Sequence, residues 1–573
     1  MYVVCTVHSN REILFDAERA YWSRLRILAW RWLSIRRTAD AAFFLLLCAW
    51  PWIGLFGREP WKADEGYTFG VIWSMAQGKS WLVPLLAGEP FMEKPPLFYW
   101  VAALCTQWFG GTVPAHDAAR IAIALFLYLT LGFLVATGNV LLGSRRAILT
   151  VVLFVGSLGL FDKVHILITD VSLLSGLSIG LYGLATSERR PVVGGIALGI
   201  GTGIAFMSKG ALGLGILTAT AVGLTFFSSW RSEHRLKSFK IAAAIAAPAV
   251  LAWPAALYIN SPELFSTWLW VNNFGRFFGF AHLGESHGLW FYPVTLGWLS
   301  FPVWPFAIAA CRAAWTGHEA RDALLLPAMA FLVTMTILMF AWQSRAIYTL
   351  PGLLPLSLLA VAGLSHAPRW FAAGLQRASR WLFPAVVGLL WLAWLAVGLE
   401  LPWAVEAVAQ REPGFVMPIA PSSIAIAGAA TVLLCLAARH RRITAENAVC
   451  VWSAGLTTFW VVFLTLWLPY LDYGNSYVTT SASMQPALPR DRSCIASMGL
   501  GESQRAMFDY YAGLITHRVE SDPAARSCHW LLVQQVGQPR TLPTDANWRE
   551  IWHDARPGDT RESFHLYRAT GPG

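Results

Sequence analysis

The chain has 573 residues, of which 56% are hydrophobic and 13% are charged, and its mean hydropathy is +0.50. A water-soluble globular protein of this length carries roughly twice that charged fraction, so the composition excludes that class. The formal net charge of +10 does not indicate a nucleic-acid partner, because no RNA- or DNA-binding motif is present and the basic residues recur in every second loop.

Long apolar runs recur along the chain, and about 17–25 residues is the length that a helix needs to cross a bilayer. Because the runs are continuous rather than alternating, they predict membrane-spanning helices. The first run, residues 41–57, follows an arginine-rich segment, so we interpret it as an uncleaved anchor with a cytoplasmic N-terminus. The later predicted spans, which bring the total to about thirteen, are 118–142, 146–161, 170–186, 192–207, 211–227, 240–259, 291–310, 323–340, 347–364, 383–401, 422–437 and 447–469.

Basic residues mark every second loop between these spans. The positive-inside rule places such loops in the cytoplasm, whereas the opposite loops contain few basic residues and mix them with acids. The pattern therefore predicts that the loop 58–100 and the C-terminus lie on the outer face of the membrane. The basic loops carry Arg145, Arg146, Arg189, Arg190, Arg231, Arg235, Lys237, Lys240, Arg312, Arg321, Arg369, Arg377, Arg380, Arg439, Arg441 and Arg442.

The loop 58–100 is far longer than a connection between two spans needs to be. The acidic pair Asp64 and Glu65 opens a predicted helix that runs to about residue 78, and the segment 93–96 precedes a second one that runs to about residue 108. Each start has a purely structural explanation, because acids and prolines stabilise the first turn of a helix. Two such starts beside a Trp-rich surface, in one outward loop, instead favour the core of an active site.

Further ionisable residues stand at the predicted outer ends of spans. Charge near bilayer depth is costly and usually faces a cavity or a partner, although snorkelling to the interface also explains a single residue such as Arg345. Arg and Lys bind the phosphate of a lipid-linked sugar and stabilise it as it departs, while a carboxylate accepts the proton of the attacking group. The full set comprises the acids Asp64 and Asp170 and the cations Arg58, Lys94, Lys209, Arg276 and Arg345.

From about residue 470 the composition becomes that of a soluble segment, and it predicts a small α/β domain over 470–573 behind a membrane domain over 1–469. Strands are expected at 494–498, 529–535 and 564–570, and a helix at 502–512 that ends at Gly513. If this domain faces an oxidising compartment, Cys494 and Cys528 can form a disulfide; free thiols are the alternative.

Several motifs resemble those of the bacterial 4-amino-4-deoxy-L-arabinose transferases of lipid A, which are GT-C-type membrane glycosyltransferases related to protein O-mannosyltransferases. The matching segments are GREPWKADE, WLVPLLAGEPFMEKPPLFYW, TD at 169–170, SKG at 208–210, GRFFGF, YTLP, LPYLDYGNSY and LGESQRAMFDYYAG. The resemblance covers nearly all of the membrane part. It implies a fold of about thirteen transmembrane helices, interfacial helices in the first outer loop (58–118) and a small periplasmic α/β domain.

The resemblance also implies a function. The enzyme would lie in the bacterial inner membrane and transfer a sugar, with inversion, from an undecaprenyl-phosphate donor to lipid A or another envelope acceptor, with membrane lipids as its other partners. Residues at matching positions receive roles: Asp64, Glu65 and Asp170 are predicted to be catalytic, and Arg58, Lys94 and Tyr348 to bind the lipid phosphate together with Arg276, Lys209 and Arg345.

A cofactor is not required by this prediction. The resemblance implies that Glu93 can take part in a divalent metal site, and His287 is the other candidate ligand. A Zn²⁺ ion needs three or four ligands, so the sequence does not complete such a site.

Two departures from the family pattern leave the sugar and the acceptor open. DEGYTFG stands where the family usually has DE-x-R-Y-A-E, and Ser344–Ile347 stands where a Lys-Leu-Pro-Thr run is usual. A protein O-mannosyltransferase-like enzyme is the alternative function. A transporter of lipid-linked sugars is less favoured, because the charges gather at one face and no inverted repeat is visible.

Overall fold

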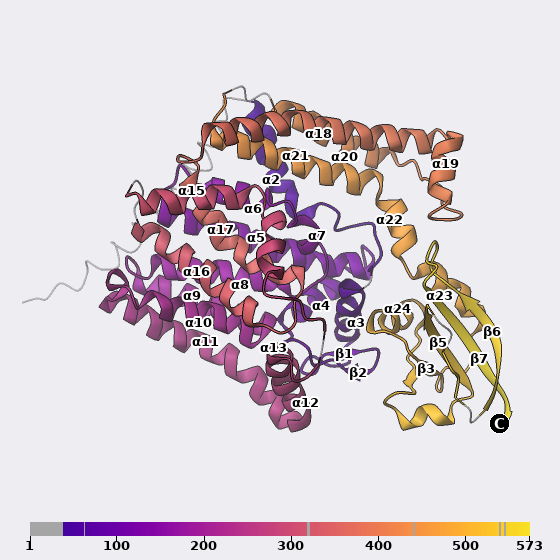
Figure 1. Cartoon of the computed structure of the whole chain (residues 1–573). Helices are drawn as coiled ribbons and strands as arrows, with labels where there is room; N and C mark the ends of the chain where they lie inside the picture. The colour runs from indigo at the N-terminus through magenta and orange to yellow at the C-terminus, as the bar shows by residue number, and fades with distance from the viewer. Residues whose placement is uncertain are drawn as a thin grey trace, which may run out of the picture.

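A bundle of long helices forms most of the molecule, and a small domain with a β-sheet stands at one end of it (Figure 1). The computed structural model describes residues 38–61, 63–282, 284–317, 321–438, 442–537, 540–543 and 546–572. The arginine-rich N-terminal segment and the predicted loop residues Arg439 and Arg441 lie outside this range. The C-terminus and the small domain lie at the same end of the bundle as α3 (Asp64–Ala76), which belongs to the predicted outer loop (Figure 1).

Seven helical segments among the described residues are long and apolar enough to cross a membrane, which makes this a multi-pass membrane protein. They are α5 (Ala115–Leu142), α9 (Pro191–Lys209), α11 (Glu233–Asn260), α16 (Arg321–Phe340), α17 (Leu350–Gly363) with the turn before it, α18 (Arg369–Gly398) and α21 (Ala445–Leu466). Shorter apolar helices pack with them: α4 (Leu97–Phe109), α8 (Asp170–Thr186), α10 (Ala211–Leu224) and α20 (Pro421–Ala437). The total of about thirteen spans stays a prediction.

Three predicted spans are not single straight helices. The span 41–57 is helical only as far as Ala49 in α2 (Thr38–Ala49) and the 3₁₀ turn after it, Trp50–Trp52. The span 146–161 consists of α6 (Ala147–Val155) and, after a non-helical link, α7 (Phe161–Val164). The span 291–310 consists of α14 (Phe291–Leu299) and α15 (Val303–Trp315), which are bent by 105° relative to each other.

The two interruptions pair with each other. The backbone amide of Leu158 donates to the carbonyl of Phe301 at 3.0 Å, and that of Gly159 donates to the carbonyl of Leu299 at 3.0 Å. Pro302 has no amide to continue a helix. Non-helical backbone inside a membrane protein needs partners of this kind, because lipid supplies none. A hydropathy profile does not reveal either break, because both segments are predominantly apolar.

The long outer loop folds as the predicted pair of helices. α3 begins at Asp64, and α4 begins immediately after Pro96. Between them lies a hairpin of β1 (Leu85–Leu86) and β2 (Glu89–Pro90), whose two turn residues, Ala87 and Gly88, have φ angles of +45° and +85°. A two-residue hairpin with the twist of the strands requires this left-handed pair.

The small domain has a mixed five-stranded sheet in the order β4-β3-β5-β7-β6. α24 (Glu502–Ala512) links the parallel strands β3 and β4, since parallel neighbours require a crossover. Gly513, at φ +59°, ends this helix as predicted. The three predicted strands are confirmed as β3 (Ala496–Met498), β5 (Trp530–Val536) and β7 (Glu562–Pro572), whereas β4 (His517–Arg518) and β6 (Ala546–Asp554) were not predicted.

The remaining helices are short or connect the larger units. Two of them, α22 (Leu468–Asn475) and α23 (Val478–Met484), lead from α21 into the sheet domain, so the boundary near residue 470 stays a prediction. The others are α2 (Thr38–Ala49), α12 (Pro262–Ser266), a π-helical segment (Thr267–Gly275), α13 (Arg276–Phe278) and α19 (Pro402–Ala409), with single 3₁₀ turns at Trp50–Trp52, Ser228–Trp230, Ala346–Thr349, Gln485–Ala487 and Pro523–Ser527.

Cys494 and Cys528 form a disulfide in the small domain, as the sequence allowed, and they are 34 residues apart. Replacing both with Ser is expected to lower the free energy of unfolding of this domain by about 2–4 kcal/mol, because the crosslink restricts the unfolded chain. Pulse proteolysis of the whole protein across a urea series measures this change. Cys311→Ser, at an exposed free cysteine, is the control; an unchanged urea midpoint in the double variant would contradict the prediction.

Candidate active site

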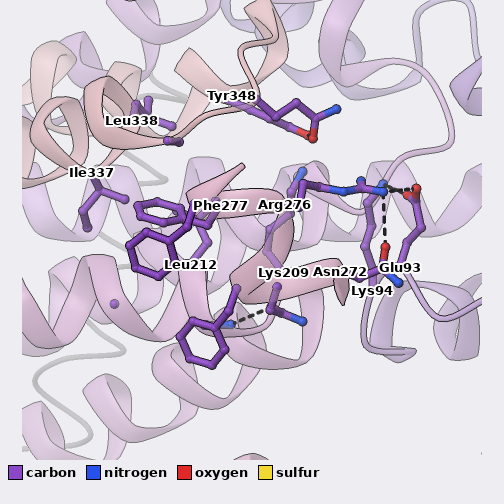
Figure 2. A pocket seen from close by; sticks show the side chains of 17 residues that line it. Glu93, Lys94, Lys209, Leu212, Asn272, Arg276, Phe277, Ile337, Leu338 and Tyr348 are labelled. Atoms are coloured by element: carbon purple, nitrogen blue, oxygen red, sulfur yellow. Dashed lines mark hydrogen bonds and ion pairs between the residues drawn. The ribbon is translucent and has the colours of Figure 1, made fainter. Parts of the chain in front are cut away.

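A cavity of about 260 Å³ lies between the outer loop and the ends of several helices. Figure 2 shows Glu93, Lys94 and Arg276 at its polar end, with Lys209 and Tyr348 also in the wall. The opposite end is apolar and is lined by Leu212, Phe277, Ile337 and Leu338 (Figure 2). Five predicted site residues from four separate parts of the chain are therefore brought into one wall.

Arg276 and Glu93 form the central ion pair of the polar end. Arg276 Nη2 donates to Glu93 Oε1 at 2.6 Å and to Asn272 Oδ1 at 3.3 Å, and Lys94 Nζ lies 3.8 Å from Glu93 Oε2. Burial alone would raise the pKa of the Glu93 carboxyl, but the charges of Lys94 and Arg276 hold it below its usual value. Arg276 Nε is buried and has no hydrogen-bond partner among the described residues. A donor left in this state is available to an anion.

Lys209 and Asp170 form a second ion pair beside the cavity. Lys209 Nζ donates to both carboxylate oxygens of Asp170, at 2.7 and 2.6 Å, and lies 4.7 Å from the centre of the Tyr348 ring. Lys209 ends α9 and Asp170 begins α8, so two neighbouring helix ends present the pair. Gly210, at φ +60°, lets the chain turn directly after the lysine.

Asp64 is linked to the cavity by hydrogen bonds but does not line it. Its carboxylate accepts from the guanidinium of Arg345 and, at 2.8 Å, from the hydroxyl of Tyr67, to which Lys94 Nζ donates at 3.3 Å. Burial would raise the pKa of the Asp64 carboxyl, but the hydrogen bond and charge of Arg345 outweigh it, so the pKa is lowered. The acid is therefore ionised and shares its charge with Arg345.

Glu65 and Arg58 lie in a different place from the one predicted. Glu65 accepts from Arg58, from Arg120 Nε at 3.0 Å and from the amide of Leu167 at 3.2 Å, and only 2% of Glu65 and 4% of Arg58 is exposed. Burial would raise the pKa of Glu65, but Arg120 and Arg58 together lower it to about 2. Neither residue is among those that line the cavity. This geometry does not support contact with substrate, and it assigns both residues to the framework of the loop.

His287 also lies apart from the cavity. It is exposed and its ring stacks on Phe291, with 4.5 Å between the ring centres. Within the part of the chain that the structure describes, no three His, Cys, Asp or Glu side chains are grouped closely enough to hold a metal ion. Since Glu93 is already paired with Arg276, these residues do not fit the suggested zinc site.

Three residues in or beside the site were not predicted from the sequence: Arg120, Tyr67 and Asn272. Arg120 offered a signal, because an arginine at the start of a predicted span requires a buried partner. Tyr67 lies one helical turn after Asp64, a spacing that places both on one face of α3. Asn272 gave no signal, because an uncharged amide in an aromatic segment is ordinary.

Glu65→Gln is expected to destabilise the whole protein, because it leaves the buried Arg58 without its anionic partner and Arg120 with Asp117 alone. Breaking a buried ion pair in this way costs about 3–5 kcal/mol. Because the pKa of Glu65 is depressed, its stabilising effect is full above its ordinary pKa and is lost only as the pH falls toward about 2. Thermal unfolding in detergent measures the effect, with Asp64→Asn as the neighbouring control; equal midpoints for the two variants would count against this role.

Comparisons with known proteins found similarity to membrane glycosyltransferases. Residues 93–258 match the family described as dolichyl-phosphate-mannose-protein mannosyltransferase. An undecaprenyl phosphate-alpha-4-amino-4-deoxy-L-arabinose arabinosyl transferase of Pectobacterium carotovorum is 25% identical over 381 residues, which are 64% of this chain and 66% of the relative. The corresponding enzyme 1 of Sodalis glossinidius is 28% identical over 380 residues, 64% of this chain and 65% of the relative. The matches span just under two thirds of these relatives.

Solved structures extend the similarity to almost the whole chain. ArnT from Cupriavidus metallidurans bound to undecaprenyl phosphate matches with a TM-score of 0.63 and 15% identity, covering 92% of this chain and 96% of that one. The apo form matches with a TM-score of 0.62 over 96% and 98% of the two chains. The chain is thus similar in sequence to the aminoarabinose transferases of the bacterial envelope and has the fold of ArnT.

Proposed function

We propose that this protein is an integral membrane glycosyltransferase that moves a sugar from a polyprenyl-phosphate donor to an acceptor at the outer face of the bacterial inner membrane. The observation that carries the proposal is the cavity, because it joins a cationic end to an apolar end. Arg276 Nε, buried and without a partner among the described residues, provides a free donor at the cationic end. The names of the relatives and the lipid bound to ArnT support the same donor class.

The donor phosphate fits among Lys94, Lys209 and Arg276. Charge-assisted hydrogen bonds to phosphate are short and strong, and a guanidinium can bind two oxygens at once. The first isoprenoid units would then extend over Phe277 and Leu338. Before the donor arrives, Glu93 and Asp170 neutralise part of this positive charge and hold the cations in position.

In the transfer, an acceptor oxygen forms a bond to the anomeric carbon, and the bond from that carbon to the phosphate oxygen breaks. The bonding electrons leave with the phosphate, where Lys94 and Arg276 stabilise the developing charge. The proton of the acceptor goes to the Asp64 carboxylate. While Arg345 is bound to it, Asp64 is a weak base, and a phosphate that attracts Arg345 would strengthen it. Asp170 positions Lys209, and no metal is assigned a step.

Lipid A or another envelope glycolipid is the acceptor that we propose, because the loop motifs resemble those of the aminoarabinose transferases of lipid A and the relatives are named as aminoarabinose transferases. A protein hydroxyl is the second candidate, and it is favoured by the family match over residues 93–258. The outer-face orientation is supported by the disulfide in the small domain, since such bonds persist in oxidising compartments. The alternation of basic loops supports it independently.

The central experiment supplies purified protein in nanodiscs with radiolabelled undecaprenyl-phosphate sugars and follows label into a lipid or protein acceptor. Asp64→Asn is expected to lower kcat by about 10²–10⁴-fold with donor binding retained, because proton transfer is lost. Arg276→Ala is expected to weaken donor binding about 10–100-fold, because charge-assisted hydrogen bonds are lost. Arg411→Ala, at an exposed arginine outside the cavity, is the control. Movement of labelled lipid across the bilayer without transfer would overturn the proposal in favour of transport.

The pH dependence of transfer tests the pairing of Asp64 with Arg345. In the wild type, Arg345 holds the pKa of Asp64 below its usual value, so the base stays ionised and activity persists at acidic pH. In Arg345→Gln the main offset to the burial of Asp64 is lost and only Lys94 and Tyr67 still oppose it, so its pKa rises and the acid limb of the kcat profile moves to higher pH. A limb that stays in place, or moves to lower pH, would show that Asp64 is not the titrating base.

A further inference from the structure

The small domain meets the outer loop through a helix crossing with almost no space between the backbones. Gly66 and Gly70 lie one turn apart on α3 and face α24. A Cβ atom added at Gly70 would lie 2.4 Å from Cβ of Ala506, and one added at Gly66 would lie 3.1 Å from Cβ of Ser503. The first distance is impossible without a shift of one helix, whereas the second requires only a small adjustment. The position of α3 is therefore tied to that of α24.

Polar contacts hold the loop on both sides of this crossing. Ser503 Oγ donates to the carbonyl of Ala63, the residue directly before Asp64, at 2.5 Å. The Tyr511 hydroxyl donates to Glu59 Oε2 at 2.5 Å. These two hydrogen bonds attach the small domain to the chain immediately before Asp64, the candidate catalytic carboxylate.

A third attachment lies on the hairpin that leads to the other half of the site. Glu89, in β2, forms ion pairs with Arg505 at 3.0 Å and with Arg518 at 3.4 Å. Glu89 lies four residues before Glu93 in the same connection, so the small domain reaches both acidic segments of the loop.

Glu502, the first residue of α24, also interacts with residues at the charged end of the cavity. Glu502 interacts electrostatically with Glu93, Arg276 and Lys94, all of which line the cavity, and it makes no ion pair among the described residues. Burial and the nearby charge of Glu93 raise the pKa of its carboxyl. The N-terminal end of α24 therefore stands close to the cavity and not only against the back of α3.

We propose that α24 of the small domain is a positioning element of the active site, which holds Asp64 at its working place through the contact of Gly66 and Gly70 with Ser503 and Ala506. The inference rests on the proposed function, because Asp64 is the carboxylate that it positions. The donor phosphate is held by Lys94, Lys209 and Arg276, none of which lies on α3. A shift of α3 therefore moves Asp64 directly and reaches the donor site only through the hydrogen bond from Lys94 to Tyr67. An error of about 1 Å in the place of a catalytic group can cost 10²-fold in rate.

The experiment compares a variant that introduces a steric clash between α3 and α24 with a double variant that removes it. Gly70→Ala introduces a Cβ that meets Cβ of Ala506 and also lies 2.9 Å from Cδ1 of Leu86, the far end of a flexible side chain that can move aside. The double variant Gly70→Ala/Ala506→Gly removes the opposing Cβ of Ala506 again. Gly66→Ala is the graded case, because its Cβ has more room. Gly132→Ala, in α5, is the matched control, since no atom lies within 4 Å of its added Cβ. Ala506→Gly alone accounts for the destabilising effect of a glycine within a helix.

Transfer and donor binding are measured for each variant in nanodiscs, together with hydrogen exchange of residues 63–76. Gly70→Ala is expected to lower kcat about 10–100-fold with the KM for donor changed less than two-fold. Gly66→Ala should be milder, the double variant should recover most of the loss, and Gly132→Ala should match wild type. Faster exchange of α3 in Gly70→Ala, reversed in the double variant, is the structural signature.

Three results would overturn the positioning role: wild-type kcat in Gly70→Ala, a double variant no better than the single one, or equal losses in kcat and donor affinity. If Gly70→Ala fails to fold, Ser503→Ala replaces it, because it removes one hydrogen bond beside Asp64 and adds no volume; wild-type kcat there also counts against the role. If wild-type protein transfers no sugar, the proposed function fails, and unchanged exchange of α3 in Gly70→Ala separately refutes the contact.

Discussion

The buried ion cluster of Glu65 with Arg58 and Arg120 is the interaction on which the rest of the site depends. Arg120 stands in α5, one of the membrane-spanning helices, while Glu65 and Arg58 belong to the outer loop. Arg120 also donates to the backbone carbonyls of Arg58 at 2.6 Å and of Glu59 at 3.0 Å. Charges buried this deeply are tolerated only when every partner is in place, so the cluster permits one position of the loop.

This constraint explains why the adjacent acids Asp64 and Glu65 have different partners. Consecutive residues of a helix point about 100° apart, so when Glu65 faces Arg120 its neighbour Asp64 must face elsewhere. It faces Arg345 and Tyr67, and Tyr67 links it to Lys94 in the wall of the cavity. Glu65 therefore holds the helix, and Asp64 is the acid to which we assign the proton transfer.

Cations at the charged end of the cavity are also paired with carboxylates. Each of the cations Arg276 and Lys209 carries a carboxylate partner, Glu93 and Asp170 respectively, and each pair joins segments far apart in sequence. Pairing keeps the cations ordered and lowers the cost of burying them. A phosphate that enters such a site meets donors that are already oriented, and the apolar wall beside them suits its lipid tail. The small domain adds a further layer of order, because α24 touches the loop that carries Asp64.

The sequence by itself determined the membrane class, the helix starts at Asp64 and after Pro96, and the helix 502–512, and it predicted five of the residues that line the cavity. These features depend on local composition and on patterns of neighbouring residues, and both can be interpreted from the sequence with general physical rules. The sequence could not show that Asp64 and Glu65 have different partners, because both satisfy the same local pattern. Only the distant Arg120 and Arg345 distinguish them.

Only the tertiary structure decided the breaks within two apolar segments, the edge strand β6 and the contact of Gly70 with Ala506. Each of these depends on a partner that is remote in the chain: Leu158 on Phe301, β6 on β7, and α3 on α24. Hydropathy averages over a window of neighbours, and it carries no information about which carbonyl or methyl group a residue meets across the fold. For that reason the sequence supplied candidate residues, and the packing of distant segments decided which of them line the cavity and which lie elsewhere.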